Sequence, residues 1–158
     1  MHDITPCLWF DTEAEDAARM YTSVFPNSRI TSISHYGEGA PRQAGMVMVV
    51  AFELDGRPFT ALNGGPQYTF SEAVSFQVMC DDQAQIDHFW DALGDGGEPG
   101  PCGWLRDRFG VSWQIVPRRL TELLSQSDPE TSQRVMQCMM GMGKLVIAEL
   151  EGAAAANV

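Results

Sequence analysis

Cysteine thiols are the strongest nucleophiles and the softest metal ligands that this chain of 158 residues offers. The four cysteines are widely separated, at Cys7, Cys80, Cys102 and Cys138. Structural zinc sites usually take paired ligands at short spacing, and no C-x-x-C pair occurs in the sequence. We therefore expect reduced thiols that are mostly buried. Cys102 is the candidate nucleophile, because it lies beside glycine-rich chain.

Histidine can act as a general base or a metal ligand, but the chain has only three: His2, His35 and His88. A Ser-His-Asp or Cys-His catalytic arrangement therefore has little material to draw on. His35 falls on an expected strand and could point into a cleft. His88 falls on the helix face opposite Phe89 and Leu93, where we expect it to be solvated.

The composition excludes several classes of partner. The formal net charge is -11, so a nucleic-acid backbone or an anionic membrane surface would repel the chain. No run of about 18 apolar residues is present, so no membrane span is expected. The N-terminal residues lack the basic and apolar regions of a secretory signal, which predicts a cytoplasmic protein.

The first half of the chain predicts a strand at residues 4–10, then a helix, then three strands. Thr12 and Glu15 have the spacing of a capping box, which satisfies two free amide donors at the helix start. Asp55-Gly56 is a tight-turn signal, because glycine tolerates a positive φ. The three expected strands are residues 28–36, 46–54 and 57–63.

The second half repeats this order. A strand at residues 73–80 precedes a second capping box, Asp82 with Gln85, which opens a helix. A glycine-rich loop is expected at residues 94–101, and a hairpin that turns near Gly110 follows it. The buried face of the helix is predicted to hold Ile86, Phe89, Trp90 and Leu93.

The two halves form an internal repeat, in which Asp11 corresponds to Asp81 and Ala14 to Ala84. We predict an α+β fold with two βαβββ-like modules that form a curved mixed sheet around a cleft, plus C-terminal helices. The expected boundaries within one compact unit are an N-terminal module at 1–66, a C-terminal module at 67–120 and a helical tail at 121–158.

The helical tail has its own start signal at Asp128-Pro129-Glu130. Aspartate suits the N-cap, proline the first turn, and glutamate the positive end of the helix dipole. Apolar residues from Val135 to Leu150 form a stripe that must cover either the protein's own sheet or a partner chain.

Several segments together resemble the vicinal-oxygen-chelate superfamily, which includes glyoxalase I and bleomycin-resistance proteins. The resemblance is closest to its PhnB-like branch, often labelled 3-demethylubiquinone-9 3-methyltransferase. It spans about residues 4–150 and rests on ITPCLWF with AARMYTSVFPNS, FELDGRPFTALNGGP, CGWLRDRFGVSWQIVP and VMQCMMGMGKL. Homodimers are common in this superfamily, so the resemblance implies a homodimer.

The methyltransferase label is at odds with the glycine pattern. A typical methyltransferase cradles its sulfonium cofactor at a glycine-rich turn between a parallel strand and a helix. Here the run Gly94-Asp95-Gly96-Gly97 follows a helix instead of opening one. We therefore expect no methyl transfer from this chain alone, and no cofactor.

Catalytic members of the superfamily hold a divalent metal with four inward side chains, one from each of four strands. The resemblance places these positions near residues 4–6 and at Ala61, Ser75 and Gln114. Only Gln114 is a usual ligand type, because alanine cannot bind a metal and serine is a poor neutral ligand. We therefore expect a cleft without metal.

Strand alternation predicts which side chains line that cleft. The expected substrate-binding residues are apolar or neutral and polar: Leu8, Phe10, Ala61, Asn63, Ser75, Gln77, Trp104 and Gln114. Such a lining suits a small uncharged or amphipathic molecule, and Trp104 could stack on a planar ligand. Arg106-Asp107-Arg108 is expected to be a solvated turn whose ion pair contributes little, with ligand anchoring as the alternative.

Three functions stay open from the sequence. The chain could be a binding module for a small organic molecule. It could be a metal-dependent lyase, isomerase or dioxygenase-type enzyme that uses Gln114 and His35. It could instead be a dimeric structural or regulatory protein, which the methionine-rich tail suggests. The sequence assigns neither the ligand nor any reaction.

Overall fold

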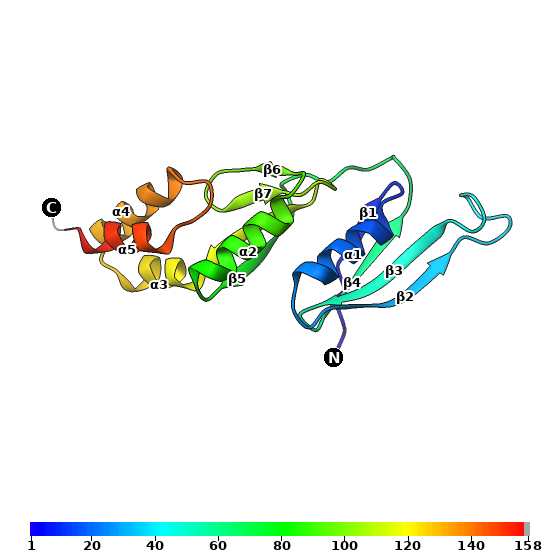
Figure 1. Ribbon diagram of the computed structural model, residues 1–158, viewed down its shortest axis with the longest axis horizontal. Helices are drawn as coiled ribbons and strands as arrows, with labels where there is room; N and C mark the ends of the chain where they lie inside the picture. Colours follow the sequence, from blue (N-terminus) through cyan, green and yellow to red (C-terminus); the bar gives the residue numbers. More distant parts are fainter. Residues whose placement is uncertain (157–158) are drawn as a thin grey trace. The chain divides into compact units, whose positions relative to one another are not determined.

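A computed structural model describes residues 1–156 and divides the chain into two compact units (Figure 1). Unit 1 spans Met1–Phe70, and unit 2 begins at Ser71. Each unit contains one four-stranded mixed sheet that is not closed into a barrel. The predicted α+β class and the two-module repeat are confirmed. No helix in the described part of the chain is long and apolar enough to cross a membrane.

Unit 1 is a four-stranded sheet with one helix on one face (Figure 1). The strand order is β1-β4-β3-β2; β1 pairs with β4 in parallel, and the other pairs are antiparallel. The elements are β1 (Cys7–Phe10), α1 (Ala14–Val24), β2 (Arg29–His35), β3 (Val47–Leu54) and β4 (Arg57–Asn63).

Small side chains let α1 approach its sheet closely. Ala14, Ala17 and Ala18 are fully buried, and Tyr21 packs near Phe52 with 6.4 Å between the ring centroids. Asp55 and Gly56 both have positive φ, so they form the expected two-residue turn between β3 and β4.

Unit 2 repeats the pattern with strand order β5-β8-β7-β6. β5 and β8 pair in parallel, and α2 buries Ile86, Phe89 and Leu93 against the sheet. The two-residue β6 lies inside the segment that we predicted to be a loop, so that prediction is wrong there. The elements are β5 (Ser75–Cys80), α2 (Gln83–Gly94), β6 (Glu98–Pro99), β7 (Trp104–Arg106) and β8 (Ser112–Pro117).

The second predicted capping box is present. Asp82 Oδ1 accepts a hydrogen bond from Gln85 N at 2.8 Å, and Gln85 Oε1 accepts one from Asp81 N at 2.9 Å. The Gln85 side chain therefore bonds to the backbone amide of Asp81, which lies one residue before the N-cap residue Asp82. The side chains of Asp82 and Gln85 together satisfy donors at the start of α2.

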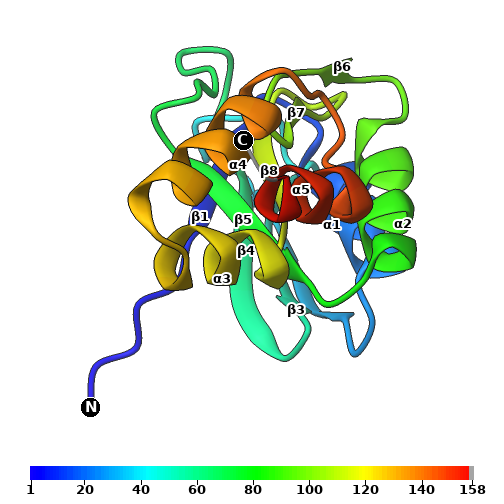
Figure 2. The ribbon, with the colours of Figure 1, turned by 90° about the vertical axis from the view of Figure 1, so that its left-hand side faces the viewer.

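The tail helices α3 (Arg118–Gln126), α4 (Pro129–Met140) and α5 (Ile147–Ala155) pack against one another, as Figure 2 shows in yellow, orange and red. Asp128 caps α4 by accepting a hydrogen bond from Thr131 N at 2.8 Å, as predicted. The buried core of the tail also packs against Val116 of β8, so the apolar stripe covers the protein's own sheet. This core consists of Leu120, Leu123, Val135, Leu145 and Leu150.

Two further pairs of hydrogen bonds fix the tail to α2 and to the loop before β7. The side chain of Gln83 at the start of α2 donates to Leu145 O at 3.1 Å and accepts from Ile147 N at 2.9 Å. Cys102 N and Gly103 N donate to the carbonyls of Met142 and Gly143, each at 2.8 Å. The segment between α4 and α5 therefore pairs with the loop before β7.

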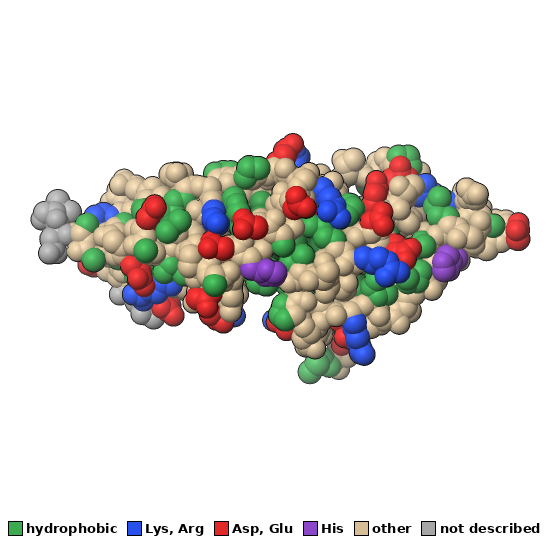
Figure 3. Space-filling model, viewed as in Figure 1, with side chains coloured by type: hydrophobic (Ala, Val, Ile, Leu, Met, Phe, Trp, Pro, Cys, Tyr) green, Lys and Arg blue, Asp and Glu red, His purple; other side chains and the backbone are tan. Residues whose placement is uncertain are grey.

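Several charged side chains form pairs of opposite charge on the surface. On the face seen in Figure 3, basic side chains lie beside acidic ones. Examples are Arg29 with Glu53 at 3.1 Å and Arg118 with Asp81 at 2.9 Å. Arg118 and Asp81 are both exposed, and Arg29 is exposed beside a half-buried Glu53, so each pair contributes at most about 1 kcal/mol.

Candidate functional site

The open face of the unit 2 sheet carries the neutral polar side chains that the sequence pattern singles out. β5 and β8 run in register, with Ser75 opposite Ser112 and Gln77 opposite Gln114. The alternate residues of β8, Trp113 and Ile115, are buried. Side chains alternate along a strand, so Ser75, Gln77 and Gln114 share the face opposite α2.

These open-face side chains are hydrogen-bonded to one another. Gln114 Nε2 donates to Ser75 Oγ at 2.8 Å, and Gln77 Nε2 lies 3.4 Å from Gln114 Oε1. Trp104 of β7 is half-buried and pairs with Gln114 across the sheet. The arrangement presents oriented amide donors and acceptors beside an aromatic ring. It carries no formal charge.

The predicted lining residues of unit 1 lie on the other side of their sheet. Leu8, Phe10, Ala61 and Asn63 are only 1–6% exposed, because they face α1. The strand alternation that we predicted is present, but the helix covers the face that we assigned to the cleft. The opposite face of β1 and β4 carries the following side chains: Cys7, Trp9, Thr60 and Leu62.

Asn63 has a structural task in this core. Its Oδ1 accepts a hydrogen bond from Ala14 N at 2.9 Å, and its Nδ2 donates to Val47 O at 3.0 Å. The Asn63 side chain of β4 therefore caps the start of helix α1. The predicted capping box of Thr12 and Glu15 is wrong, because the N-cap residue is Glu13 and its side chain makes no cap bond.

Trp9 organises the chain that follows β4. Its Nε1 donates to Gly65 O at 2.9 Å, and its ring meets the edge of Tyr68 with 5.0 Å between centroids. A Cβ at Gly64 would lie 2.3 Å from the Trp9 ring, so only glycine fits there. The connector after β4 is therefore built around an indole on the open face of unit 1.

The residues present do not fit a divalent metal. Hard cations favour several carboxylates or imidazoles, whereas the open face of unit 2 offers hydroxyl and amide oxygens. Ala61 has no donor atom and lies on the helix side; His35 and His88 are exposed. Within residues 1–156, no three His, Cys, Asp or Glu side chains cluster as metal ligands would.

Asp107 corrects the prediction of a solvated charged turn. It is 3% exposed, and its Oδ1 accepts hydrogen bonds from Phe109 N at 2.8 Å and Val111 N at 3.0 Å. Its Oδ2 accepts from Trp113 Nε1 at 2.9 Å. Asp107 therefore organises the β7–β8 hairpin from inside, while the neighbouring Arg106 pairs with Glu98 across β6 and β7.

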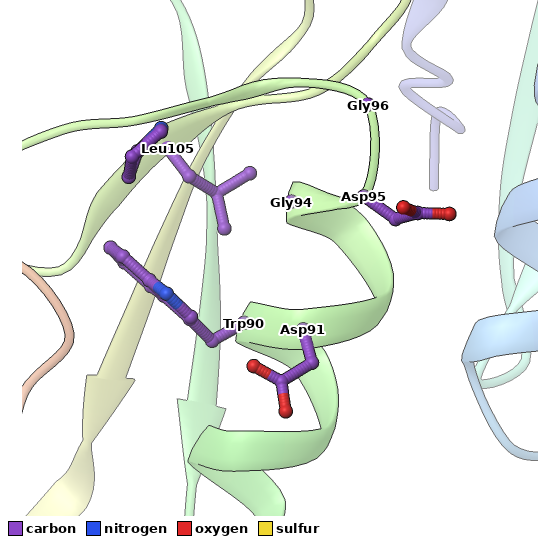
Figure 4. Close-up of a pocket in the computed structure, with 7 residues that line it drawn as sticks. Trp90, Asp91, Gly94, Asp95, Gly96 and Leu105 are labelled. Atoms are coloured by element: carbon purple, nitrogen blue, oxygen red, sulfur yellow. The ribbon is translucent and has the colours of Figure 1, made fainter.

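The described residues of unit 2 line a pocket on the β6–β7 hairpin and another beside α2. The hairpin pocket, of about 410 Å³, lies on the β6–β7 hairpin and is lined by Glu72, Glu98 to Cys102, Trp104 to Arg106 and Ser112. The second hollow, of about 320 Å³, lies beside α2. In Figure 4, its carboxylates, Asp91 and Asp95, point in different directions, so they do not converge on a ligand.

Comparison with protein families places the chain. Residues 2–116 match a family model described as 3-demethylubiquinone-9 3-methyltransferase. This chain belongs to that family. The PhnB-like resemblance and the wider vicinal-oxygen-chelate superfamily are thereby confirmed, and helices α3 to α5 lie beyond the matched residues. A comparison with curated proteins gives no match.

Solved structures agree with the PhnB-like assignment. A Bacillus cereus protein described as a 3-demethylubiquinone-9 3-methyltransferase and PhnB protein is 34% identical, with a TM-score of 0.66 over 73% of this chain and 99% of that one. A Pseudomonas aeruginosa protein is 20% identical, with a TM-score of 0.62 over 74% and 98% of the two chains. The fosfomycin resistance protein FosX from Mesorhizobium loti, at 14% identity, has a TM-score of 0.54 over 73% and 90%. The last two likenesses show the fold alone.

Proposed function

We propose that this PhnB-like protein binds a small uncharged or amphipathic organic molecule on the open face of unit 2, without a metal. The observation that carries the proposal is the bonded set of Ser75, Gln77 and Gln114 beside Trp104. Hydrogen-bond groups in fixed orientations next to an aromatic surface are typical of sites for small organic ligands.

The amide groups retain bonding capacity for a ligand. Gln114 Nε2 has two hydrogens and gives one to Ser75, and a carbonyl oxygen such as Gln77 Oε1 has two lone pairs. Gln77 is exposed, whereas Ser75 and Gln114 are half-buried. A ligand oxygen or hydroxyl could therefore bond to the pair while its apolar part lies against Trp104.

Methyl transfer is not part of the proposal, although the family description names it. The glycine run of unit 2 ends α2 and leads into β6, and Gly96 has a φ of 73° in that turn. A sulfonium cofactor needs the opposite order, with a glycine-rich turn that opens a helix. The metal-dependent lyase or dioxygenase alternative lacks support because the donor set is neutral.

A titration with 2-naphthol, a planar uncharged probe with one hydroxyl, tests the proposal. In nitrogen–proton correlation spectra, the side-chain amide signals of Gln77 and Gln114 should shift with saturation. Gln114→Leu should weaken binding about tenfold, because one or two neutral hydrogen bonds are lost. Gln43→Leu, on an exposed loop of unit 1, is the matched control and should bind as the wild type does.

Two results would contradict this proposal. One is a titration in which the Gln77 and Gln114 amide signals do not move. The other is binding that a chelator abolishes and a divalent ion restores, because that would require a metal at the site. We also propose a homodimer from the family resemblance, and light scattering should then give twice the mass of one chain. A monomer mass would refute the dimer and leave the ligand proposal standing.

A further inference from the structure

The hairpin pocket contains a buried hydroxyl that no other group uses. Ser112 is 2% exposed, and its Oγ has no hydrogen-bond partner among the described residues. A buried hydroxyl left unpaired carries the free-energy cost of its lost hydration. Ser112 lines the hairpin pocket, so a ligand oxygen in the pocket would satisfy the hydroxyl and recover that cost.

The same pocket contains a thiol on an unusual backbone. Cys102 has a φ of 59°, in the left-handed region that glycine and short polar residues adopt most easily. The other described non-glycine residues with positive φ, Asn27 and Asp55, belong to that tolerated class. Glycine at position 102 would avoid this backbone strain, so a cysteine occupies a position where backbone preference favours glycine.

The backbone around Cys102 is held on both sides. Cys102 N donates to Met142 O, and Ile115 N donates to Gly103 O, each at 2.8 Å. The cysteine is not in a disulfide and is half-buried. Cys102 therefore lines the pocket from a backbone that is hydrogen-bonded on both sides.

The walls and the rim of the pocket select for uncharged planar ligands. Trp104, Pro99 and Pro101 give the lining its apolar surface. Among the charged lining groups, Arg106 is paired with Glu98, and Glu72 adds a second carboxylate. This acidic rim disfavours anions, whereas the indole can stack on a conjugated system.

We propose that the hairpin pocket captures planar α,β-unsaturated carbonyl compounds through conjugate addition of the Cys102 thiol. The sulfur forms a bond to the β-carbon as the carbon–carbon π bond breaks, and the electron pair moves to the carbonyl oxygen. Ser112 donates a hydrogen bond to the resulting enolate. The proton lost by the thiol ends on the α-carbon, so the step needs neither an oxidant nor a leaving group.

This inference goes beyond reversible binding on the open face. It is tested by a different measurement, the formation of a covalent adduct. The probe is benzylideneacetone, and intact mass with peptide mapping measures the adduct. Modification of Cys102 should gain the full mass of the probe, and its rate should saturate with probe concentration. Exposed Cys7 is the internal reference and should react in simple proportion to concentration. Benzylacetone, the saturated analogue, should give no adduct.

Variants separate capture from chance alkylation. Cys102→Ser should abolish the saturable reaction, and Cys138→Ser, at another half-buried free cysteine, should leave it unchanged. Ser112→Ala should slow the reaction at least tenfold, while circular dichroism checks that the variant folds. Gln114→Leu should leave capture intact even where it weakens 2-naphthol binding, so the two proposals can fail independently.

Two results would overturn the inference. One is a Cys102 rate that rises linearly with probe concentration and does not exceed that of Cys7. The other is a folded Ser112→Ala variant that reacts as fast as the wild type, because the orphan hydroxyl would then have no part in capture.

Discussion

Asn63 Oδ1 in β4 caps helix α1 by accepting the backbone hydrogen bond of Ala14, which lies 49 residues earlier in the chain. The same side chain donates to Val47 O, so one buried amide connects the helix start to two strands of the sheet. The bond fixes the helix to the sheet by a nonlocal contact where the local capping box fails.

Asn63→Ala should therefore lower the free energy of unfolding by about 2 kcal/mol or more, because it removes an N-cap bond and leaves buried groups unpaired. Urea denaturation measures the change. Thr12→Ala is the matched control; the Thr12 side chain is exposed and should contribute little. If Thr12→Ala lowered the free energy of unfolding more than Asn63→Ala, the result would support the capping box of Thr12 and Glu15 instead.

Asp107→Asn tests the hairpin centre. The carboxylate accepts hydrogen bonds from two backbone amides at Oδ1 and from the Trp113 indole at Oδ2. The asparagine oxygen can replace only one of these two acceptors, and its amide nitrogen would face a donor at the other. We expect a loss of about 3 kcal/mol in unfolding free energy, since hydrogen bonds to a buried charge are strong. Asp91→Asn, at an exposed position on α2, should change stability by less than about 0.5 kcal/mol. Equal stabilities would contradict the role of Asp107.

We predict that the Cys80 thiol causes a loss of stability at alkaline pH. Burial, together with the charges of Asp81 and Asp82 and against that of Arg118, raises the pKa of Cys80 from 9.0 to about 11. The folded state therefore keeps its proton where the unfolded chain loses it. This contribution is complete below pH 9.0 and is lost as the pH rises toward about 11. Cys80→Ala should flatten that part of the stability curve, and an unchanged slope would contradict the shift.

Gln83→Ala tests how the tail is held. The Gln83 side-chain amide is hydrogen-bonded to Leu145 O and Ile147 N, and the variant loses both bonds. The variant should therefore expose the segment between α4 and α5 to protease. Limited proteolysis and hydrogen exchange should both report faster opening of residues 141–147. Gln137→Ala, exposed on α4, is the control and should behave as the wild type does. Identical cleavage rates would show that the apolar core alone secures the tail.

Strand alternation predicted which residues share a face, but it identified the open face in only one unit. In β5, polar Ser75 and Gln77 alternate with apolar Phe76 and Val78, so the polarity shows which side meets the helix. In β1, Leu8 and Phe10 alternate with Cys7 and Trp9, and neither face is polar. No local signal could decide the side there.

At Asn63 a polarity signal was present, but it indicated the wrong face. A polar side chain near the end of a strand normally suggests an exposed or ligand-facing position, whereas this one is buried to satisfy a helix start. Asp107 was misread in the same way, because its partners lie inside the hairpin that it organises. Buried polar groups depend on tertiary partners, which residue type and spacing do not reveal.

The backbone bonds from Cys102 and Gly103 to Met142 and Gly143 join the tail to the loop that lines the hairpin pocket. A compound that binds more tightly while these bonds are formed would favour tail docking by the same factor by which docking favours binding. The helices beyond the family-matched residues would then act as an effector of the module they cover. Loosening them would tune affinity without altering a single residue that touches the ligand.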